Sequence, residues 1–450
     1  MKKILVLLII SSSLALAGGT RITVPYTRFT LPDGLDVILH EDHSVPTISV
    51  NLWYHVGSAR EKPGRTGFAH LFEHIMFMGS KDAPEGKFDE WLEAAGGDNN
   101  ATTSTDRTDY YENVPSNALD LPLFLESDRM GHLLETMTPA KVDAQRAVVK
   151  NERRQSYENR PYGMASMLLV DSLYPPDHPY HWLPIGSMAD LSAATFADVQ
   201  QFFKTYYLPN NASLVIAGDI DPAKTKARVE YWFSDVKAGP RVPPQPVPVA
   251  SLSSERRIVY EDKVQLPRLY MAWLTPRWFD PGDAELDLLA SVLAGGKNSR
   301  LYKRLVYDMQ IAQDVTAYEA SLPLGSTFRI VVTARSGHTL TEIERVVQEE
   351  IDRVKREPPT QHELERAVNQ YEASFLDRLE SIPGKADQLN EYVTSTGNPD
   401  YFNEDLARYK AIDARGLQAM AQTWLPDDGR VILSIVPTGR KDLAAQKEGR

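Results

Sequence analysis

Residues 238–248, Ala-Gly-Pro-Arg-Val-Pro-Pro-Gln-Pro-Val-Pro, contain five prolines in eleven positions and divide the chain near its middle. Because proline fixes its own backbone and restricts the residue before it, such a run favours an extended, semi-rigid segment. We therefore predict a linker at residues 238–250, between a first domain at residues 18–237 and a second domain at residues 251–450. A chain of 450 residues is also longer than one hydrophobic core usually serves.

The two halves of the chain end in the same way. A Leu-Pro pair at residues 208–209 follows a helical pattern and precedes the apolar, strand-like run 212–218. A second Leu-Pro pair at residues 425–426 precedes the similar run 431–436, close to the C-terminus. A shared order of helix, turn and strand at a fixed spacing is typical of an internal duplication. We therefore expect two homologous domains.

Both halves mix strand patterns with helical patterns. Period-2 runs predict strands at 35–40, 47–56 and 268–274, and helical periodicity predicts helices at 68–78, 87–95, 119–135, 141–157, 284–293 and 341–355. Strands stand beside long helices without strict alternation, which favours the α+β class. We predict in each domain a mixed or antiparallel sheet with helices packed on one face.

The N-terminus has the features of an export signal. Residues 1–17 begin Met-Lys-Lys, continue as a largely apolar run and end with Ala-Leu-Ala. This order predicts a signal peptide that is removed before Gly18. The alternative is a membrane anchor, but the apolar run is short for a bilayer span. We therefore expect an exported bacterial protein, periplasmic or secreted, with no stable membrane insertion after cleavage.

Composition excludes several kinds of chemistry. The chain has no Cys, which excludes thiolate catalysis and thiolate metal ligands. Its 61 acidic residues exceed its 49 Lys and Arg residues, and the formal net charge of −12 disfavours nucleic acid as the main partner. A peptide substrate is compatible with this composition.

One helical segment carries the chemistry. Residues 66–78 read Thr-Gly-Phe-Ala-His-Leu-Phe-Glu-His-Ile-Met-Phe-Met, and we expect Thr66 to cap the helix. At about 100° per residue, His70, Glu73 and His74 share one face, opposite the apolar side chains. Imidazoles at i and i+4 can bind one Zn²⁺, and a neighbouring carboxylate can take a proton from an attacking water. The third ligand must be a His or a carboxylate from another helix.

These residues resemble the insulinase, pitrilysin and mitochondrial-processing-peptidase family of zinc peptidases, whose signature is H-x-x-E-H followed by a distant Glu. The chain is most similar to the short, two-domain bacterial members. Four further stretches resemble landmarks of that family, namely 57–61 (Gly-Ser-Ala-Arg-Glu), 96–103 (Gly-Gly-Asp-Asn-Asn-Ala-Thr-Thr), 110–111 (Tyr-Tyr) and 295–302 (Gly-Gly-Lys-Asn-Ser-Arg-Leu-Tyr).

The resemblance implies a role for particular residues. His70, His74 and Glu152 would hold one Zn²⁺ per chain, with Glu73 as the general base. The second domain would lack a metal motif, and the two domains would face each other across a chamber. Residues 100–101, Asn100-Ala101, would lie on an edge strand to which a peptide substrate adds as an extra strand.

The sequence departs from the family pattern in two places. Gln145 stands where many members have another Glu, seven residues before the ligand. Val306 and Gln313 occupy the positions of an Arg and a Tyr, seven residues apart, that bind substrate in active members. Arg300 and Tyr307 are also seven residues apart, but they do not align with those positions. The resemblance therefore implies a hetero- or homodimer in which a partner subunit supplies the Arg/Tyr pair.

We predict a zinc-dependent endopeptidase that hydrolyses peptides or unfolded polypeptide segments. Two alternatives remain open at this point. One is a non-catalytic member of the family that binds peptides or supports an assembly, although such subunits typically lose part of the zinc motif. The other is a hydrolase that acts on a substrate other than a peptide.

Overall fold

The computed structural model describes residues 21–447, so the predicted signal peptide lies outside the described residues. The elements of the first half are β1 (Thr27–Thr30), β2 (Asp36–Glu41), β3 (Thr47–Tyr54), α1 (Phe68–Ile75), α2 (Lys87–Ala94), β4 (Asp98–Thr103), β5 (Thr108–Pro115), α3 (Asp120–Thr136), α4 (Pro139–Arg153), α5 (Ala165–Leu173), α6 (Met188–Ala193), α7 (Phe196–Tyr206), β6 (Ala212–Gly218) and α8 (Pro222–Trp232). Residues 238–250 form neither helix nor strand.

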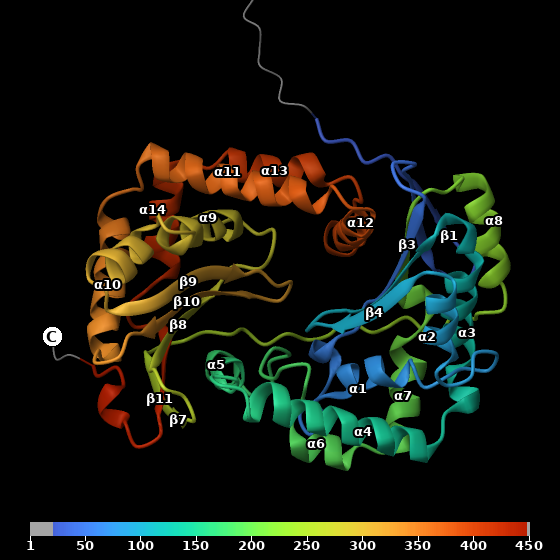
Figure 1. Ribbon diagram of the computed structural model, residues 1–450, viewed down its shortest axis with the longest axis horizontal. Helices are drawn as coiled ribbons and strands as arrows, with labels where there is room; N and C mark the ends of the chain where they lie inside the picture. The colour runs from blue at the N-terminus through green and yellow to red at the C-terminus, as the bar shows by residue number, and fades with distance from the viewer. Residues whose placement is uncertain (1–20, 448–450) are drawn as a thin grey trace, which may run out of the picture.

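The second half contains β7 (Arg256–Asp262), β8 (Arg268–Thr275), α9 (Asp283–Ala294), β9 (Ala312–Ala320), β10 (Ser326–Ala334), α10 (Leu340–Arg356), α11 (Gln361–Arg378), α12 (Ile382–Thr396), α13 (Phe402–Lys410), α14 (Ala414–Trp424) and β11 (Arg430–Pro437). Figure 1 shows the two halves side by side, each built around one sheet. Among the described residues, no helix has the length and apolar character needed to cross a membrane.

The two sheets share one topology. The first has the strand order β1-β2-β6-β3-β5-β4, and the second has the order β7-β11-β8-β10-β9. In each sheet the last strand of the half pairs in parallel with the first or second strand (β6 with β2, β11 with β7) and antiparallel with its other neighbour (β3 or β8), and all remaining pairs are antiparallel. Apart from the extra strand β1, the orders correspond one to one. This correspondence is what an internal duplication produces, and the fold is α+β with two mixed sheets.

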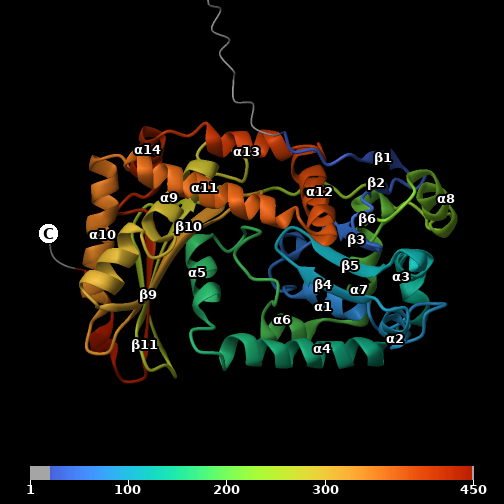
Figure 2. The same cartoon turned by 45° about the horizontal axis from the view of Figure 1, so that its top comes forward.

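Each half contributes one helix to the other half. Helix α12 packs on the first sheet, where Leu389 and Tyr392 join a buried cluster with Ile38 and Val215. Helix α5 packs on the second sheet in the same manner (Figures 1 and 2). Strands buried on both faces read as continuous apolar runs, and all seven residues of β6 are buried. The prediction of helices on one face of each sheet is therefore incomplete, because a crossing helix covers the second face.

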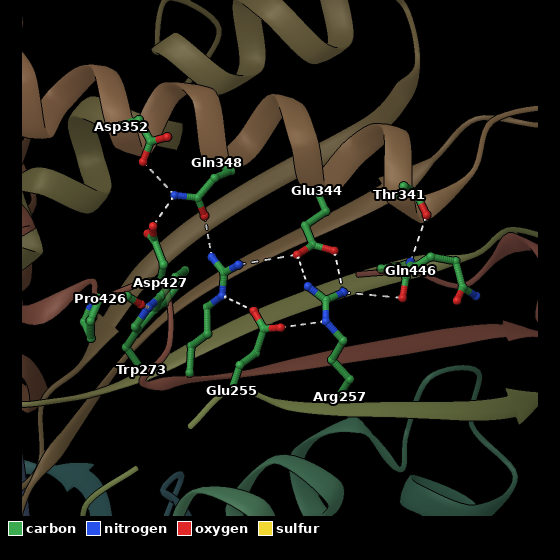
Figure 3. Close-up of polar contacts among 12 residues, drawn as sticks. Glu255, Arg257, Trp273, Thr341, Glu344, Gln348, Asp352, Pro426, Asp427 and Gln446 are labelled. Atoms are coloured by element: carbon green, nitrogen blue, oxygen red, sulfur yellow. Dashed lines mark hydrogen bonds and ion pairs between the residues drawn. The ribbon is translucent and has the colours of Figure 1, made fainter. Parts of the chain in front are cut away.

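A polar network on the second half ties its parallel strands to α10. Glu344 of α10 lies 2.6 Å from Arg257 of β7, and Glu255 lies 2.7 Å from Arg257 and 2.8 Å from Arg430 of β11 (Figure 3). Each charged group in this network has a partner of opposite charge. The network is consistent with a structural role.

The first half contains a buried ion triad. The Arg129 side chain, 1% exposed, pairs with Glu126 and lies 3.3 Å from Glu112. Its guanidinium also lies 4.3 Å from the ring centroid of Tyr110. Breaking a buried pair from one side leaves an uncompensated charge. We expect Arg129→Met to lower the free energy of unfolding by about 3–5 kcal/mol, as measured by urea denaturation.

A triple variant provides the control for this expectation. Adding Glu112→Gln and Glu126→Gln to Arg129→Met replaces the two buried carboxylates that have lost their cationic partner, so part of the lost stability should return. A loss below about 1 kcal/mol for Arg129→Met, the range of an exposed pair, would contradict the expectation.

Candidate active site

Helix α1 presents three candidate functional side chains on one face, and its other face packs against the core. Its apolar side chains, namely Phe68, Leu71, Phe72 and Ile75, are buried. The side chains of His70 and His74 are 14% and 24% exposed. The predicted helix at residues 68–78 therefore exists, although its last turn ends at Ile75.

The N-terminus of α1 is capped by a residue that sequence reasoning missed. The cap position is Gly67, which has a φ of 90° and no side chain to offer. The Glu61 carboxylate instead accepts hydrogen bonds from the backbone N–H groups of Gly67 at 2.9 Å and Ala69 at 2.8 Å. Burial raises the pKa of Glu61 to about 8. Glu61 belongs to the Gly-Ser-Ala-Arg-Glu stretch, which is the signal that could have revealed it.

The prediction that Thr66 caps α1 is wrong. The Thr66 hydroxyl donates instead to Asp190, at 2.6 Å. A capping side chain accepts a hydrogen bond from the first turn while its own backbone is extended. Here the left-handed Gly67 separates Thr66 from the helix, so Thr66 joins α1 to α6.

The structure brings His70, His74 and Glu152 together. Glu152 lies at the end of α4, where its Oε2 is 3.6 Å from Nε2 of His70 and 3.4 Å from Nε2 of His74. One ligand atom from each of the three residues lies within 4.8 Å of the others, and within residues 21–447 no other group of three His, Asp or Glu residues meets that condition.

The three residues fit a zinc ion. Two imidazole nitrogens and one carboxylate oxygen form the donor set of a catalytic zinc site, which keeps a fourth position open. Ligand atoms at about 2.0–2.2 Å from a tetrahedral zinc lie roughly 3.3–3.6 Å apart, and the distances of Glu152 Oε2 from the two Nε2 atoms, 3.6 and 3.4 Å, fall within this range. Burial lowers the pKa of His70 to about 4, so its imidazole is neutral at neutral pH, as metal binding requires. The hydrogen bond with His74 lowers the pKa of Glu152.

Glu73 lies between the two histidines in sequence, and a side chain from β4 binds its carboxylate. The Thr103 hydroxyl donates to Oε2 of Glu73 at 2.5 Å. Burial raises the pKa of Glu73, and this hydrogen bond opposes the rise. A half-buried carboxylate with a raised pKa and a fixed orientation is suited to general-base work. Thr103 ends the Gly-Gly-Asp-Asn-Asn-Ala-Thr-Thr stretch, but only the fold shows what its side chain contacts.

If Thr103 orients Glu73, its hydroxyl should matter for turnover. We expect Thr103→Val to lower kcat about tenfold or more with little change in KM, because a hydrogen bond to a charged group contributes roughly 1.5–3 kcal/mol. Thr103→Ser keeps the hydroxyl and should restore most of the rate. Equal kcat values for the Val and Ser variants would show that the hydroxyl does not position Glu73.

Strand β4 is an outer strand of the first sheet, as the resemblance implied for Asn100 and Ala101. It pairs with β5 on one side only. The Asn100 side chain accepts a hydrogen bond from the Ala101 N–H at 2.8 Å, so it is engaged with its own strand.

The structure shows what surrounds the residues that depart from the family pattern. The Gln145 amide lies 2.7 Å from the sulfur of Met78. Val306 is buried, Gln313 is exposed on β9, and Arg300 pairs with Glu363 at 2.6 Å. Tyr307 is exposed. The correctly spaced residues Arg300 and Tyr307 therefore do not form a pair.

Comparison with known families agrees with this geometry. Residues 36–174 match the family described as insulinase (peptidase family M16), and residues 193–371 match the peptidase M16 inactive domain. The chain belongs to peptidase family M16. Both domains of an M16 peptidase are thus present in order, and His70, Glu73, His74 and Glu152 all lie within the first match.

Individual M16 relatives align with most of this chain. The zinc protease PqqE of Helicobacter pylori is 28% identical over 382 residues, covering 83% of this chain and 85% of that protein. A crystal structure of a protease from Helicobacter pylori superposes with a TM-score of 0.87 at 26% identity, over 92% of this chain and all of that one. The periplasmic protease PqqL of Escherichia coli shares the fold, with a TM-score of 0.77 at 20% identity over 93% of this chain and 48% of that chain.

Proposed function

We propose that this M16 protein is a zinc-dependent endopeptidase of the H-x-x-E-H type. The observation that carries the proposal is the convergence of His70, His74 and Glu152, from two helices, beside the oriented carboxylate of Glu73. Similarity to relatives named zinc proteases supports the same activity. The part that matches an inactive domain begins at residue 193, after all four of these residues.

His70, His74 and Glu152 would hold one zinc ion per chain. Zinc bound there would supply Lewis acidity, which polarises a scissile carbonyl and lowers the pKa of water. Glu73 would accept the proton of the attacking water and deliver it to the leaving amine. Thr103 would hold the Glu73 carboxylate in place throughout, because its hydroxyl contacts the oxygen Oε2.

The substrate is proposed to be a peptide or an unfolded polypeptide segment. An extended peptide can add to the free edge of β4 through backbone hydrogen bonds, a mode that reads shape more than sequence. Asn100 and Ala101 lie on that strand, and Thr103 at its end contacts Glu73.

We also propose residues 18–237 as the catalytic domain, residues 238–250 as the linker and residues 251–450 as the second domain.

A partner subunit is proposed to complete the site. Val306 and Gln313 stand in place of the Arg and Tyr that the resemblance implies, and Arg300 is already engaged by Glu363. We propose a hetero- or homodimer, in which only a partner of different sequence would supply that pair, because a second copy of this chain also carries Val306 and Gln313. Export to the periplasm or the medium is proposed from the N-terminal pattern of residues 1–17, and PqqL, which shares the fold, is described as periplasmic.

Metal removal tests the proposed function. The purified chain should contain about one zinc per molecule and should cleave a mixture of quenched fluorescent peptides, alone or with a co-purifying partner. Treatment with a chelator should abolish cleavage, and added zinc should restore it, because metal affinity resides in three preformed ligands. A zinc-containing protein that cleaves no peptide in either condition would favour the non-catalytic, peptide-binding alternative.

A further inference from the structure

The proposed metal site depends on how two helices lie relative to each other. His70 and His74 come from α1, and Glu152 comes from the end of α4. A metal-binding imidazole usually donates its second ring N–H to a neighbouring acceptor, which fixes the orientation of the ring. The Nδ1 atom of His70 is buried and has no hydrogen-bond partner among the described residues. The position of His70 therefore depends on where the backbone of α1 lies.

One segment, residues 184–194, contacts both of these helices. It consists of the stretch 184–187, Pro-Ile-Gly-Ser, and the short helix α6, and we call it the bridging segment. Figures 1 and 2 show α6 next to α4. Its contacts with α4 and with the start of α1 are made by different residues, so each can be considered separately.

The contacts with α4 come from three basic side chains, spaced four and three residues apart on one face of the helix. Each donates a hydrogen bond to the bridging segment, namely Arg146 to the Ala194 carbonyl at 2.5 Å, Lys150 to the Ser192 hydroxyl at 2.8 Å and Arg153 to the Gly186 carbonyl at 2.6 Å. Arg153 directly follows Glu152 in the chain. The bridging segment is thus bound to α4 up to the proposed ligand.

The contacts with α1 are made at Thr66, just before the helix begins. Oδ2 of Asp190 accepts hydrogen bonds from the Thr66 backbone N–H at 3.0 Å and from the Thr66 hydroxyl at 2.6 Å. The same hydroxyl oxygen accepts a hydrogen bond from the N–H of Ser187 at 3.0 Å. Because Thr66 is buried, its polar groups rely on protein partners, here two residues of the bridging segment.

Gly186 brings the bridging segment into backbone contact with the start of α1. A Cβ atom on Gly186 would lie 2.4 Å from both N and Cα of Gly67, and the two glycines have φ values of 66° and 90°. Such an approach in the left-handed region favours glycine at both positions. The Gly186 carbonyl also accepts the hydrogen bond from Arg153. One residue therefore touches both elements that carry the proposed ligands.

We infer that the bridging segment sets the separation between the two histidines and Glu152, and that Asp190 and Gly186 are positioning residues for zinc binding. Asp190 acts on α1 through Thr66, and Gly186 acts through the backbone of Gly67. The inference rests on the proposed zinc site and adds what sets its affinity. Ligands that are already in place bind a metal more tightly, because no free energy is spent on bringing them together.

Asp190→Ala tests the hydrogen bonds to Thr66. It removes the acceptor of both Thr66 donors, whereas Asp190→Asn keeps an acceptor oxygen. Competition with a chromogenic chelator should give a zinc Kd about tenfold or more above that of the wild type for Asp190→Ala, and within about threefold of the wild type for Asp190→Asn. Asp221→Ala, which removes the capping side chain of the separate helix α8, is the matched control and should keep the wild-type Kd.

Gly186→Ala tests the backbone contact. The added Cβ should displace the start of α1, so the zinc Kd should again rise about tenfold or more. Gly439→Ala is the matched control, because Gly439 also has a positive φ, 78°, but nothing lies within 4 Å of its added Cβ. Far-UV circular dichroism and the Tm establish that each variant is folded. If Gly186→Ala does not fold, Asp190→Ala decides.

Cobalt substitution separates positioning from a general loss of stability. The visible absorption of bound Co²⁺ depends on the arrangement of its ligands. The spectrum should change in Asp190→Ala and Gly186→Ala and should match the wild type in both control variants. A variant that is only less stable would give the wild-type spectrum, because its folded molecules keep the same ligand geometry.

Wild-type zinc Kd values and cobalt spectra in Asp190→Ala and Gly186→Ala would overturn the inference and leave the proposed function intact. A Kd for Asp190→Asn as high as that for Asp190→Ala would also overturn it, since the hydrogen bonds to Thr66 would then not be the cause. If the wild type binds zinc but cleaves no peptide, altered Kd values and spectra in the variants would support the inference and refute the peptidase function. A wild type that binds neither metal would overturn both.

Discussion

Replacing Glu73 with Gln should lower kcat by about 10²–10⁴-fold, the range that a positioned general base contributes, while zinc content stays near that of the wild type. Gln has almost the same shape and can still accept a hydrogen bond from the Thr103 hydroxyl, so the change removes proton acceptance and little else. The measurement combines metal analysis of the purified protein with cleavage of the peptide mixture. Loss of activity with retained zinc separates the chemical step from metal binding.

The control for this variant is Glu90→Gln on α2, an exposed Glu that pairs with Lys87 of the same helix. It should leave both zinc content and kcat unchanged. Retention of more than about a tenth of the wild-type kcat by Glu73→Gln, far above the loss expected of a general base, would assign proton transfer to another group. Loss of zinc along with activity would instead place Glu73 among the groups that hold the metal.

Replacing Glu152 with Gln should remove both zinc and activity. Glu152 is the carboxylate of the cluster, and His70 and His74 alone leave the metal with two protein ligands. Even a change outside the ligand set typically costs about 10–100-fold in metal affinity, so loss of a ligand should cost more. We expect the zinc content of the dialysed protein to fall from about one per chain to near zero.

The folded state should survive this change. The Glu152 side chain is 38% exposed and contacts the two imidazoles across the site, not the core. The Tm of the metal-free variant should therefore match that of the metal-free wild type, while added zinc should raise the Tm of the wild type alone. Asp143→Asn, on the exposed side of the same helix, is the control and should keep its zinc. Full zinc content in Glu152→Gln would exclude Glu152 as a ligand.

Local patterns in the sequence determined a large part of this protein. The 3.6-residue period of residues 66–78 placed His70, Glu73 and His74 on one face of a helix, because that relationship depends only on helical geometry. The predicted strands and helices agree with the structure to within a few residues at their ends. The repeated Leu-Pro turn predicted two related halves, and the two sheets have corresponding strand orders.

Only the tertiary structure decided which distant residues meet. The spacing of two histidines cannot locate a third ligand, and the resemblance alone pointed to Glu152; its distance from the imidazoles follows from how α4 packs beside α1. The same holds for Glu61 at the start of α1 and for Thr103 beside Glu73. Each contact joins elements that are separate in sequence, so no local period encodes it.

The positions of the crossing helices α5 and α12 and the contacts of the bridging segment also depend on elements that are far apart in the sequence. Nothing in the periodicity of α5 or α12 says that each covers the sheet of the other half, because an apolar helix face is equally compatible with either sheet. Thr66, Arg153 and Gly186 lie on three separate stretches of the first half, and only the packing of those stretches brings them together. The sequence by itself thus determined the strands and helices that its periodicity predicts, the repeat and one face of the proposed metal site. The packing of non-adjacent elements decided the position of Glu152 beside the two histidines, the orientation of Glu73 and the contacts of the bridging segment, because those depend on contacts between residues far apart in the chain.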